Sequence, residues 1–378
     1  MPLSSSNEIS LSPEPASLNA DPLAIADSRR RGRGAATNRS GRFEPLSREG
    51  FDDGWDSLED LPPLKTEVQE EQARTIITRN QSPDLSFDRS INPYRGCEHG
   101  CVYCFARPSH AFMGLSPGLD FETRLFAKPN AAQLLERELS RPGYTPRVIA
   151  IGTNTDPYQP LERGYRLMRE ILEVLEACSH PVAIVTKSAL VMRDIDILSR
   201  LAERNLVKVA LSVTTLDRKL CRSMEPRASA PHKRLEAIRA LSEAGVPTSV
   251  MMAPIIPALN DAEIEKLLEA AAGHGATEAA FVLLRLPLEV SELFRDWLLR
   301  ERADRYRHVM NLIRSMRGGK DYDANWGERM RGRGPYADQI AKRFALAAKR
   351  FGLNLRRKKL STDAFVQPQK GGVQLDLF

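Results

Sequence analysis

Short apolar runs alternate with amphipathic stretches from Ser86 to about residue 290, and this alternation limits the possible folds more than any other feature of the chain. Five apolar runs have the composition of buried strands: residues 147–152, 181–186, 207–214, 247–254 and 279–286. The stretches between them repeat apolar residues at helical spacing: residues 161–178, 191–204, 230–244 and 261–273. Strands and helices that alternate in this way form a parallel sheet. With one more strand before Cys97, the pattern predicts six βα units, which is an α/β fold of the partial (β/α)6 TIM barrel type.

Three of the five cysteines share one short loop, CEHGCVYC, in which they are Cys97, Cys101 and Cys104. Their Cys-x3-Cys-x2-Cys spacing leaves no fourth thiolate nearby. Cysteine thiolate is the usual ligand of a [4Fe–4S] cluster, so the loop can bind three irons and leave the fourth iron open to an outside ligand. Active sites of TIM barrels lie at the carboxyl ends of the strands. A loop that follows the first strand therefore falls on the expected catalytic face.

A zinc site is the main alternative for this loop, because Cys3His zinc sites exist and His99 and His110 lie close by. Structural zinc sites usually draw their ligands from two separated pairs, whereas three thiolates share a single turn here. The spacing therefore favours an iron–sulfur cluster over zinc. The other cysteines, Cys178 and Cys221, fall in helix-like patterns, and we interpret both as structural residues.

The cysteine loop resembles that of the radical S-adenosylmethionine (radical SAM) superfamily, and the resemblance covers roughly residues 86–290. It implies a [4Fe–4S] cluster whose open iron is chelated by the amino and carboxylate groups of SAM. It further implies an electron donor such as a flavodoxin or a ferredoxin, whose electron splits SAM and yields a 5′-deoxyadenosyl radical. In such enzymes the cofactors supply the chemistry, and the protein supplies position and a dry cavity.

A SAM pocket needs polar groups for an ammonium, a carboxylate and a ribose, and the predicted strand ends supply them. Lys187 ends the third strand and could meet a carboxylate, while Ser212 and Thr214 at the end of the fourth strand carry hydroxyls suited to a ribose. The second strand is followed by acceptors that could bind an ammonium: Thr153, Asn154, Thr155 and Asp156. Polar residues are ordinary at single strand ends, but here several strands bring them to one rim.

Longer stretches are similar to the spore-photoproduct-lyase-like branch of the superfamily: TNTDPYQPLE, VTKS, LSVTTLD and the run from Glu225-Pro226-Arg227 through MMAPIIPALND. That branch is often labelled DNA repair photolyase, and the chain is most similar to its uncharacterised bacterial members. The resemblance places Lys187 and Ser212 where the lyase contacts SAM, and Tyr103 at the aromatic position before the last cluster cysteine. Tyr103 and Arg285, which could meet a substrate phosphate from the end of the sixth strand, are the catalytic candidates.

Two positions depart from the lyase pattern. The lyase has a radical-quenching cysteine after its second strand and a relay tyrosine directly after its last cluster cysteine, and here these positions are Thr153 and Phe105. The O–H bond of threonine is too strong to return a hydrogen atom as a thiol does, and phenylalanine has no O–H bond. We therefore expect that the chain does not split thymine dimers by this route. Cys221 could replace the missing thiol only if folding brought it to the mouth of the barrel.

Composition divides the chain into four parts. Residues 1–75 contain a basic run at 29–34 and an acidic stretch at 52–71, and we expect them to be largely disordered. The basic run could contact nucleic acid, although its composition favours a solvated tail. Residues 76–290 form the barrel, with its cluster loop at 97–104. Residues 291–360 form a basic helical extension, with helices expected at 289–317 and 336–351, and residues 361–378 form a flexible tail.

Positive charge is concentrated near the C-terminus, although the net charge of the chain is only +6. Residues 329–359 have the character of a phosphate-binding surface, and equally that of a solvated helix that covers the open side of the barrel. The chain then ends in a sequence that resembles the peptide by which bacterial replication and repair proteins bind the DNA sliding clamp: Gln374, Leu375, Asp376, Leu377 and Phe378.

The cysteine content also indicates the compartment. Five cysteines, three of them clustered, argue against a disulfide framework and for a reducing environment. Residues 1–15 lack the basic start and apolar core of a secretory signal, and no apolar run reaches membrane-spanning length. We therefore expect a cytoplasmic protein that does not contact a membrane.

The first functional hypothesis is a radical SAM enzyme, lyase-like, that acts on DNA in a repair-like reaction. A second hypothesis keeps the radical chemistry and replaces DNA by RNA or a protein side chain, because phosphate contacts do not distinguish DNA from RNA. A third hypothesis is a non-catalytic iron–sulfur protein that binds nucleic acid.

Overall fold

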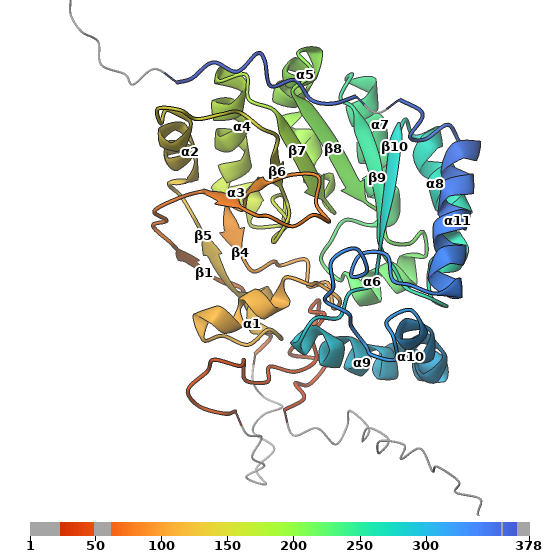
Figure 1. The fold of residues 1–378 in the computed structure, drawn as a ribbon. Helices are drawn as coiled ribbons and strands as arrows, with labels where there is room; N and C mark the ends of the chain where they lie inside the picture. Colours follow the sequence, from red (N-terminus) through yellow and green to blue (C-terminus); the bar gives the residue numbers. More distant parts are fainter. Residues whose placement is uncertain (1–22, 49–61, 357, 369–378) are drawn as a thin grey trace, which may run out of the picture.

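A twisted sheet forms the centre of the computed structural model, which describes residues 23–48, 62–356 and 358–368 (Figure 1). Within these residues the sheet has seven strands in the order β10-β9-β8-β7-β6-β3-β2. Its parallel strands are β3 (Arg89–Ile91), β6 (Ile149–Ile151), β7 (Val182–Thr186), β8 (Val207–Ser212), β9 (Thr248–Ile255) and β10 (Glu278–Leu283). β2 (Ile77–Arg79) is antiparallel to β3. The six parallel strands confirm the predicted partial barrel, which stays open because no pairing joins β10 to β2 in the described part of the chain.

The helices between these strands each bury one apolar face. They are α2 (Ala131–Leu139), α4 (Leu167–Ala177), α5 (Ile195–Glu203), α7 (Pro231–Glu243) and α8 (Ile264–Gly273). In α4 the buried residues Met168, Ile171, Leu172 and Leu175 follow the helical period and join the main core of the sheet. The stretch predicted as one helix at 161–178 is divided into α3 (Glu162–Tyr165) and α4, because Arg166 between them has a left-handed φ of 56°.

The C-terminal extension contains helices, and the stretch predicted as its first helix is broken. The predicted helix at 289–317 is α9 (Glu289–Arg302), a short 3-10 turn (Ala303–Arg305) and α10 (Tyr306–Ser315). The break lets Trp297 of α9 and Ile313 of α10 share one apolar cluster. The helix predicted at 336–351 is α11 (Pro335–Arg350). Its buried residues Ile340 and Phe344 join the main core, so this helix covers the molecule and is not merely solvated.

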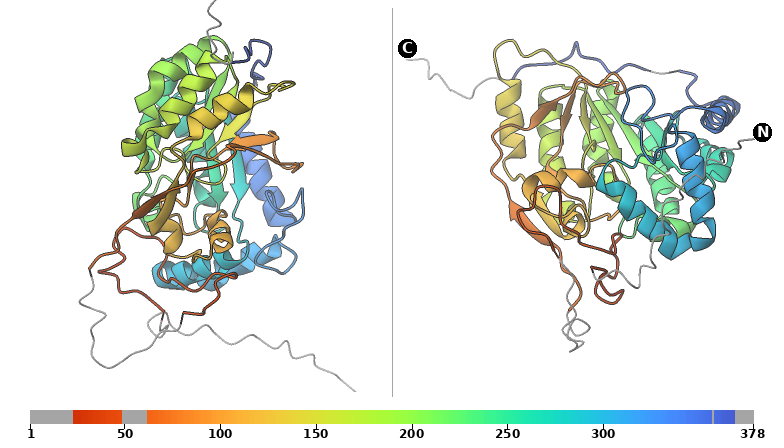
Figure 2. Two further views of the ribbon diagram at one scale, coloured as in Figure 1. Left: turned by 90° about the vertical axis from the view of Figure 1, so that its left-hand side faces the viewer. Right: turned by 60° about the horizontal axis from the view of Figure 1, so that its bottom comes forward.

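In the N-terminal segment the structure describes residues 23–48 and 62–75, which lie against the rest of the molecule, whereas composition predicts that residues 1–75 are largely disordered. Residues 23–48 run across the end of the molecule that carries α1 (Asp120–Thr123) and α9 (Figure 2). Arg33 is only 7% exposed, and Arg42 pairs with Glu289 of α9. Further along, β1 (Glu67–Glu70) pairs with β5 (Arg124–Ala127), which also pairs with β4 (Tyr94–Arg95). These segments bury little apolar surface, and polar contacts and sheet pairing order them instead.

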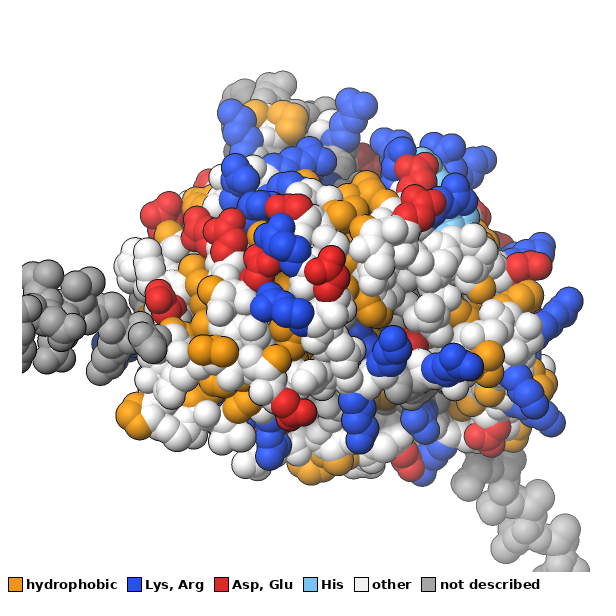
Figure 3. All heavy atoms as spheres, turned by 90° about the horizontal axis from the view of Figure 1, so that it is seen from above, with side chains coloured by type: hydrophobic (Ala, Val, Ile, Leu, Met, Phe, Trp, Pro, Cys, Tyr) orange, Lys and Arg blue, Asp and Glu red, His pale blue; other side chains and the backbone are white. Residues whose placement is uncertain are grey.

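The C-terminal segment 358–368 crosses the end of the molecule where the parallel strands begin, which differs from the flexible tail expected from residue 361. Val366 N donates to Cys178 O at 2.9 Å, and the Phe365 ring lies 5.5 Å from the ring of Tyr144. Figure 3 looks onto this end, where Lys and Arg side chains are interspersed with Asp and Glu. Within the described residues, no helix combines the length and the apolar character needed to cross a lipid bilayer.

Candidate cofactor site at the strand ends

The three clustered cysteines lie in the loop that follows β4, beside the carboxyl ends of the parallel strands. Cys97 and Cys101 are buried, Cys104 is partly buried, and none of the three forms a disulfide. The loop bends at Gly100, whose φ of +67° is left-handed and where an added Cβ would lie 2.7 Å from Glu122 Oε2. Only glycine fits this bend without strain.

The donor set of this loop fits an iron–sulfur cube better than a single zinc ion. Burial, followed by the Glu225 carboxylate, raises the pKa of the Cys101 thiol, and burial and Cys97 raise that of Cys104. A bound metal ion would favour the thiolate form of both. In the described part of the chain, no three His, Cys, Asp or Glu side chains are placed to hold one metal ion. In a cube each thiolate binds a different iron, so the three sulfurs do not have to meet at one point.

A buried ion pair fixes the position of the cysteine loop. Arg107 Nη2 lies 2.5 Å from Glu122 Oε1, and both side chains are inaccessible to solvent. Arg107 Nε also donates to Cys101 O at 2.9 Å. Glu122 Oε2 accepts from the backbone N–H of Gly34 at 2.8 Å, so the same carboxylate joins the cysteine loop to the N-terminal segment. Sequence reasoning missed both members of this pair, since neither lies in a recognisable motif.

The loop after β6 contains four predicted cofactor-binding residues, and its contacts are mainly to the protein itself. Thr155 Oγ1 donates to Gly96 O at 2.7 Å, which ties this loop to the cysteine loop. Asn154 is exposed, and its N–H donates to the Asn92 side chain, which also donates weakly to Thr153 Oγ1 at 3.4 Å. These contacts leave Asn154 as the member of the set with a side chain open to solvent.

Asp156 joins this loop to the end of β7. Its carboxylate accepts from Thr186 Oγ1 at 2.6 Å and from Lys187 N at 2.7 Å, and it lies 3.3 Å from His99 Nδ1. Burial favours the neutral acid, but the charge on His99 and these hydrogen bonds outweigh it and hold the pKa of Asp156 below its usual value. Asp156 is therefore an ionised group that positions the ends of two strands.

Four other predicted residues converge on one buried acid that sequence reasoning missed. Glu225 Oε1 accepts from Thr214 Oγ1 at 2.6 Å and from the Tyr103 hydroxyl, and Lys187 Nζ lies 3.9 Å away. Lys187 Nζ in turn donates to Ser212 Oγ at 2.6 Å. Glu225 follows the end of α6 (Arg218–Met224), a helix that the strand–helix alternation does not predict. The only sequence signal for this acid is its position directly before Pro226-Arg227.

Glu225 remains ionised although it is fully enclosed. Burial alone would raise its pKa, but the charges of Arg234 and Lys187 outweigh it and lower the pKa to about 2. Arg234 pairs with the second carboxylate oxygen, and neither side chain is accessible to solvent. Arg234 Nη1 also donates to Ser212 O at 2.8 Å. The acid and the guanidinium therefore fix the end of β8, where two of the predicted ligand residues lie.

Cys221, which we interpret from the sequence as structural, contacts this network. Its Sγ is 3.5 Å from Glu225 Oε2 and from Arg234 Nη2. Burial and the Glu225 carboxylate raise the pKa of the thiol to about 12, so it remains protonated. Cys178 packs in the main core at the other end of the sheet, as its interpretation as a structural residue predicts.

Arg285 follows β10 and lies against the residue that follows the last clustered cysteine. Its guanidinium lies 4.7 Å from the centroid of the Phe105 ring, and Nη2 donates to the Tyr322 hydroxyl at 3.4 Å. The structure thus brings Arg285 to the same end of the sheet as Tyr103. The C-terminal residues predicted to bind a sliding clamp, which lie outside the described residues, are Gln374, Leu375, Asp376, Leu377 and Phe378.

Comparisons with known proteins agree with this geometry. The family model of the Radical SAM superfamily matches residues 91–271. Uncharacterized protein Rv2578c of Mycobacterium tuberculosis is 40% identical over 230 residues, which cover 60% of this chain and 68% of that protein. Uncharacterized protein MJ0683 of Methanocaldococcus jannaschii is 27% identical over 199 residues, which cover 53% of this chain and 71% of that protein.

Solved structures of spore photoproduct lyase have a similar fold. The lyase complexed with dinucleoside spore photoproduct superposes with a TM-score of 0.55 at 15% identity, covering 76% of this chain and 80% of that chain. A mutant of the lyase with bound AdoMet and dinucleoside spore photoproduct gives a TM-score of 0.57 at 16% identity over the same shares. At this level of identity the likeness establishes the fold.

Proposed function

Because the chain belongs to the radical SAM superfamily, whose members bind a [4Fe–4S] cluster and SAM, we propose that it is an enzyme that uses both cofactors on a nucleic acid. Cys97, Cys101 and Cys104 would hold the cluster. When bound, the two cofactors supply a one-electron cleavage of SAM that starts radical chemistry on a substrate. The observation that carries the proposal is the convergence of Lys187, Ser212, Tyr103 and Thr214 beside the cysteine loop.

In this proposal the residues around Glu225 bind and orient SAM. Lys187, whose side chain is 14% exposed, would turn its ammonium from Ser212 to the SAM carboxylate. Ser212 and Thr214 would then direct hydroxyl groups to the ribose. Glu225 would hold Tyr103 and Thr214 in place through their hydroxyl groups. Asn154 has the exposed side chain of the β6 loop and would reach the SAM ammonium, while Thr153, Thr155 and Asp156 support it.

The choice of nucleic acid rests on likeness and on charge. A protein of the same fold is seen in complex with dinucleoside spore photoproduct, and the stretch from TNTDPYQPLE onward is similar to that branch. DNA is the proposed substrate, and Arg285 beside Phe105 would contact a phosphate near the cluster. Because Thr153 and Phe105 stand where the lyase has its quenching cysteine and relay tyrosine, the reaction would differ from dimer splitting by that route.

The remaining partners follow from the same proposal. A flavodoxin or ferredoxin would supply the electron, and the reaction would take place in the cytoplasm. The last five residues, Gln374 to Phe378, would bind the DNA sliding clamp through the apolar side chains of Leu377 and Phe378. A fluorescent peptide of these residues should bind purified clamp, and the Phe378→Ala peptide should not. Equal binding of both peptides would refute a specific clamp motif.

The enzyme proposal is tested by SAM cleavage. Protein reconstituted with iron and sulfide under argon should yield 5′-deoxyadenosine when dithionite and SAM are added, and a cysteine-loop variant should yield none. If clustered wild-type protein yields no 5′-deoxyadenosine, with or without DNA, the chain is a non-catalytic iron–sulfur protein. If product forms faster with RNA or with a protein fraction than with DNA, the proposed substrate is wrong while the enzyme class stands.

A further inference from the structure

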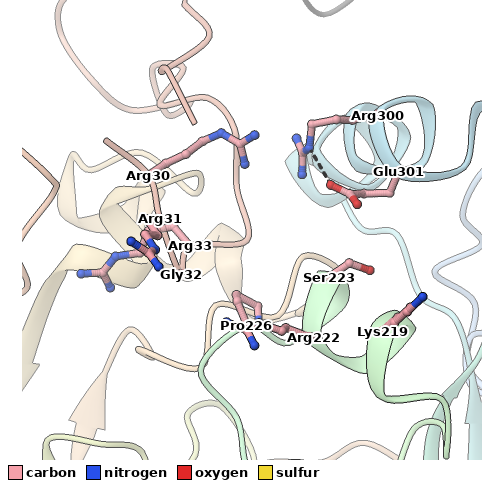
Figure 4. A pocket seen from close by; sticks show the side chains of 10 residues that line it. All are labelled: Arg30, Arg31, Gly32, Arg33, Lys219, Arg222, Ser223, Pro226, Arg300 and Glu301. Carbon is pink, nitrogen blue, oxygen red and sulfur yellow. Dashed lines mark hydrogen bonds and ion pairs between the residues drawn. The ribbon is translucent and has the colours of Figure 1, made fainter. Parts of the chain in front are cut away.

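A cavity of about 450 Å³ lies beside the cysteine loop and is lined by three parts of the chain that are far apart in sequence (Figure 4). The first wall is formed by Arg30–Arg33 of the N-terminal segment. The second wall is formed by α6 and the residues after it, and the third by α9. Among the described residues its lining has one acid, Glu301, and these cations: Arg30, Arg31, Arg33, Lys219, Arg222 and Arg300. The end of the molecule shown in Figure 3 mixes charges of both signs, whereas this cavity is strongly positive.

Two of these cations, Arg30 and Arg300, each pair with one acid, Asp27 and Glu301, but keep a further guanidinium nitrogen without an acceptor in the described part of the chain. Arg30 Nε and Arg300 Nη1 are buried and have no hydrogen-bond partner among the described residues. A buried donor without an acceptor is costly, and most such groups are satisfied by a partner or a ligand. Burial, followed by the nearby charge of Arg30, lowers the pKa of Arg300, while Glu301 and Asp27 act in the opposite direction. An anion would supply both the missing acceptors and the missing charge.

Residues that directly follow lining residues in the sequence contact the cysteine loop. An added Cβ at Gly34, the residue after Arg33, would lie 1.9 Å from Gly100 O, so the two backbones are in close contact. On the opposite wall, Val102 N donates to Met224 O at 3.0 Å. An anion in the cavity therefore lies next to the proposed cluster site and not on a remote surface.

We infer that this cavity binds consecutive phosphate groups of a nucleic acid backbone and so presents a neighbouring nucleotide to the strand ends. Guanidinium groups match phosphate oxygens in pairs, and a set of cations fits a polyanion better than a single small anion. The side chains of the lining carry the charge for backbone contacts, so binding should depend little on base sequence. The inference rests on the proposed function for its substrate, but binding is measurable without SAM.

Three exposed cations of the lining provide a clean test. Arg31, Lys219 and Arg222 are exposed and make no side-chain hydrogen bond or ion pair to the described residues, so their replacement should not unfold the protein. We expect the triple variant Arg31→Gln, Lys219→Gln and Arg222→Gln to bind a fluorescent single-stranded DNA about 10- to 100-fold more weakly. The slope of log Kd against log salt concentration should also become shallower, by an amount that corresponds to roughly two to three ion contacts.

The matched control is Arg147→Gln, an exposed arginine where β6 begins, at the other end of the sheet. It should bind the DNA like wild type, and iron content and melting temperature should confirm that both variants are folded and loaded. Equal DNA affinity of the triple variant and wild type would overturn the inference, as would a mononucleotide that competes as well as the polymer does. If the wild type binds DNA but never cleaves SAM, and the triple variant loses DNA binding, the cavity is supported as the phosphate-binding site and the proposed reaction is refuted.

Discussion

Lys187 Nζ lies 2.6 Å from Ser212 Oγ, and this contact joins the carboxyl ends of the neighbouring strands β7 and β8. The same ammonium lies 3.9 Å from Glu225 Oε1 and over the ring of Tyr103, 5.8 Å from its centroid. A single cation thus touches three elements that the sequence places far apart. Because its present hydrogen-bond acceptors, Ser212 Oγ and Ala253 O, are both neutral, a carboxylate that enters the site would be a stronger partner for it.

Removal of the Lys187 charge should weaken SAM binding. A hydrogen bond to a charged group contributes about 1.5–3 kcal/mol, so Lys187→Met should raise the Kd for SAM by about 10- to 100-fold. Equilibrium dialysis of cluster-loaded protein under argon measures this Kd. The control is Lys208→Met, because Lys208 pairs with Glu278 near the start of β8. If the two variants bind SAM equally well, Lys187 is not a ligand of its carboxylate.

Loss of any clustered cysteine should prevent loading of the cube. Cys101→Ala leaves only two thiolates on the loop, so iron and sulfide content and visible absorption should fall to background after reconstitution. Cys178→Ala, in the core at the other end of the sheet, should retain the cluster. Retention of stoichiometric iron and sulfide by the Cys101 variant would mean that the loop does not hold the cluster.

The ion pair between Arg234 and Glu225 should be essential for stability, because both side chains are fully buried. Arg234→Met leaves the Glu225 charge without its main partner, and an uncompensated buried charge costs about 3–5 kcal/mol of unfolding free energy. Urea denaturation of the apoprotein measures this loss. Lys233→Met is the neighbouring control, since its pair with Glu236 is half exposed and should contribute little to stability. Equal midpoints for the two variants would contradict this account.

His180 should make the fold sensitive to acid. Its Nδ1 lies 3.0 Å from Pro181 O and therefore donates, so the neutral ring accepts from the Tyr144 hydroxyl at Nε2. Burial, opposed by that carbonyl, lowers the pKa of His180 to about 4, with Arg89 acting in the same direction as burial. In the unfolded chain His180 takes up a proton near pH 6.5. The stability that the neutral buried ring gives to the folded state is therefore fully present above pH 6.5 and is lost as the pH falls towards 4.

The size of this effect is up to about 3 kcal/mol, as the shift between the folded and unfolded pKa implies. Melting temperature should therefore fall more steeply between pH 6.5 and 4 for wild type than for His180→Gln, whose amide can still accept from Tyr144. His232→Gln is the control, because His232 is an exposed histidine of α7. Parallel pH profiles for wild type and His180→Gln would show that the residue does not titrate as described.

The parallel strands could be predicted because their apolar runs are long and continuous, as in 207–214, where β8 lies. The residues that end these strands were predictable for the same reason, and Lys187, Ser212 and Thr214 do meet. Glu225 was not predictable, because it lies after the short helix α6 and its partners Tyr103 and Arg234 come from other elements. Its contacts run from Cys221, four residues before it, to Tyr103, 122 residues before it, and no repeated spacing in the sequence indicates this set.

The placement of residues 23–48 was not predicted, for a different reason. Their order does not come from apolar burial, which is the quantity that a composition argument measures. Arg33 Nη1 donates to Glu122 O at 2.8 Å and Nη2 to Thr66 Oγ1 at 2.9 Å, and these contacts connect residues about 30 and 90 positions apart. A run of Arg and Gly looks solvated in the sequence and becomes buried only when distant carbonyl groups surround it.

The close contact of Gly34 with Gly100 has a practical consequence for experiments on shortened chains. A chain cut to the family match at residues 91–271 would keep all three clustered cysteines and most of the sheet. It would lack the backbone that Glu122 binds through Gly34 N, and the cysteine loop would then face water on that side. We expect such a fragment to lose its iron to air or to a chelator faster than the full-length protein does.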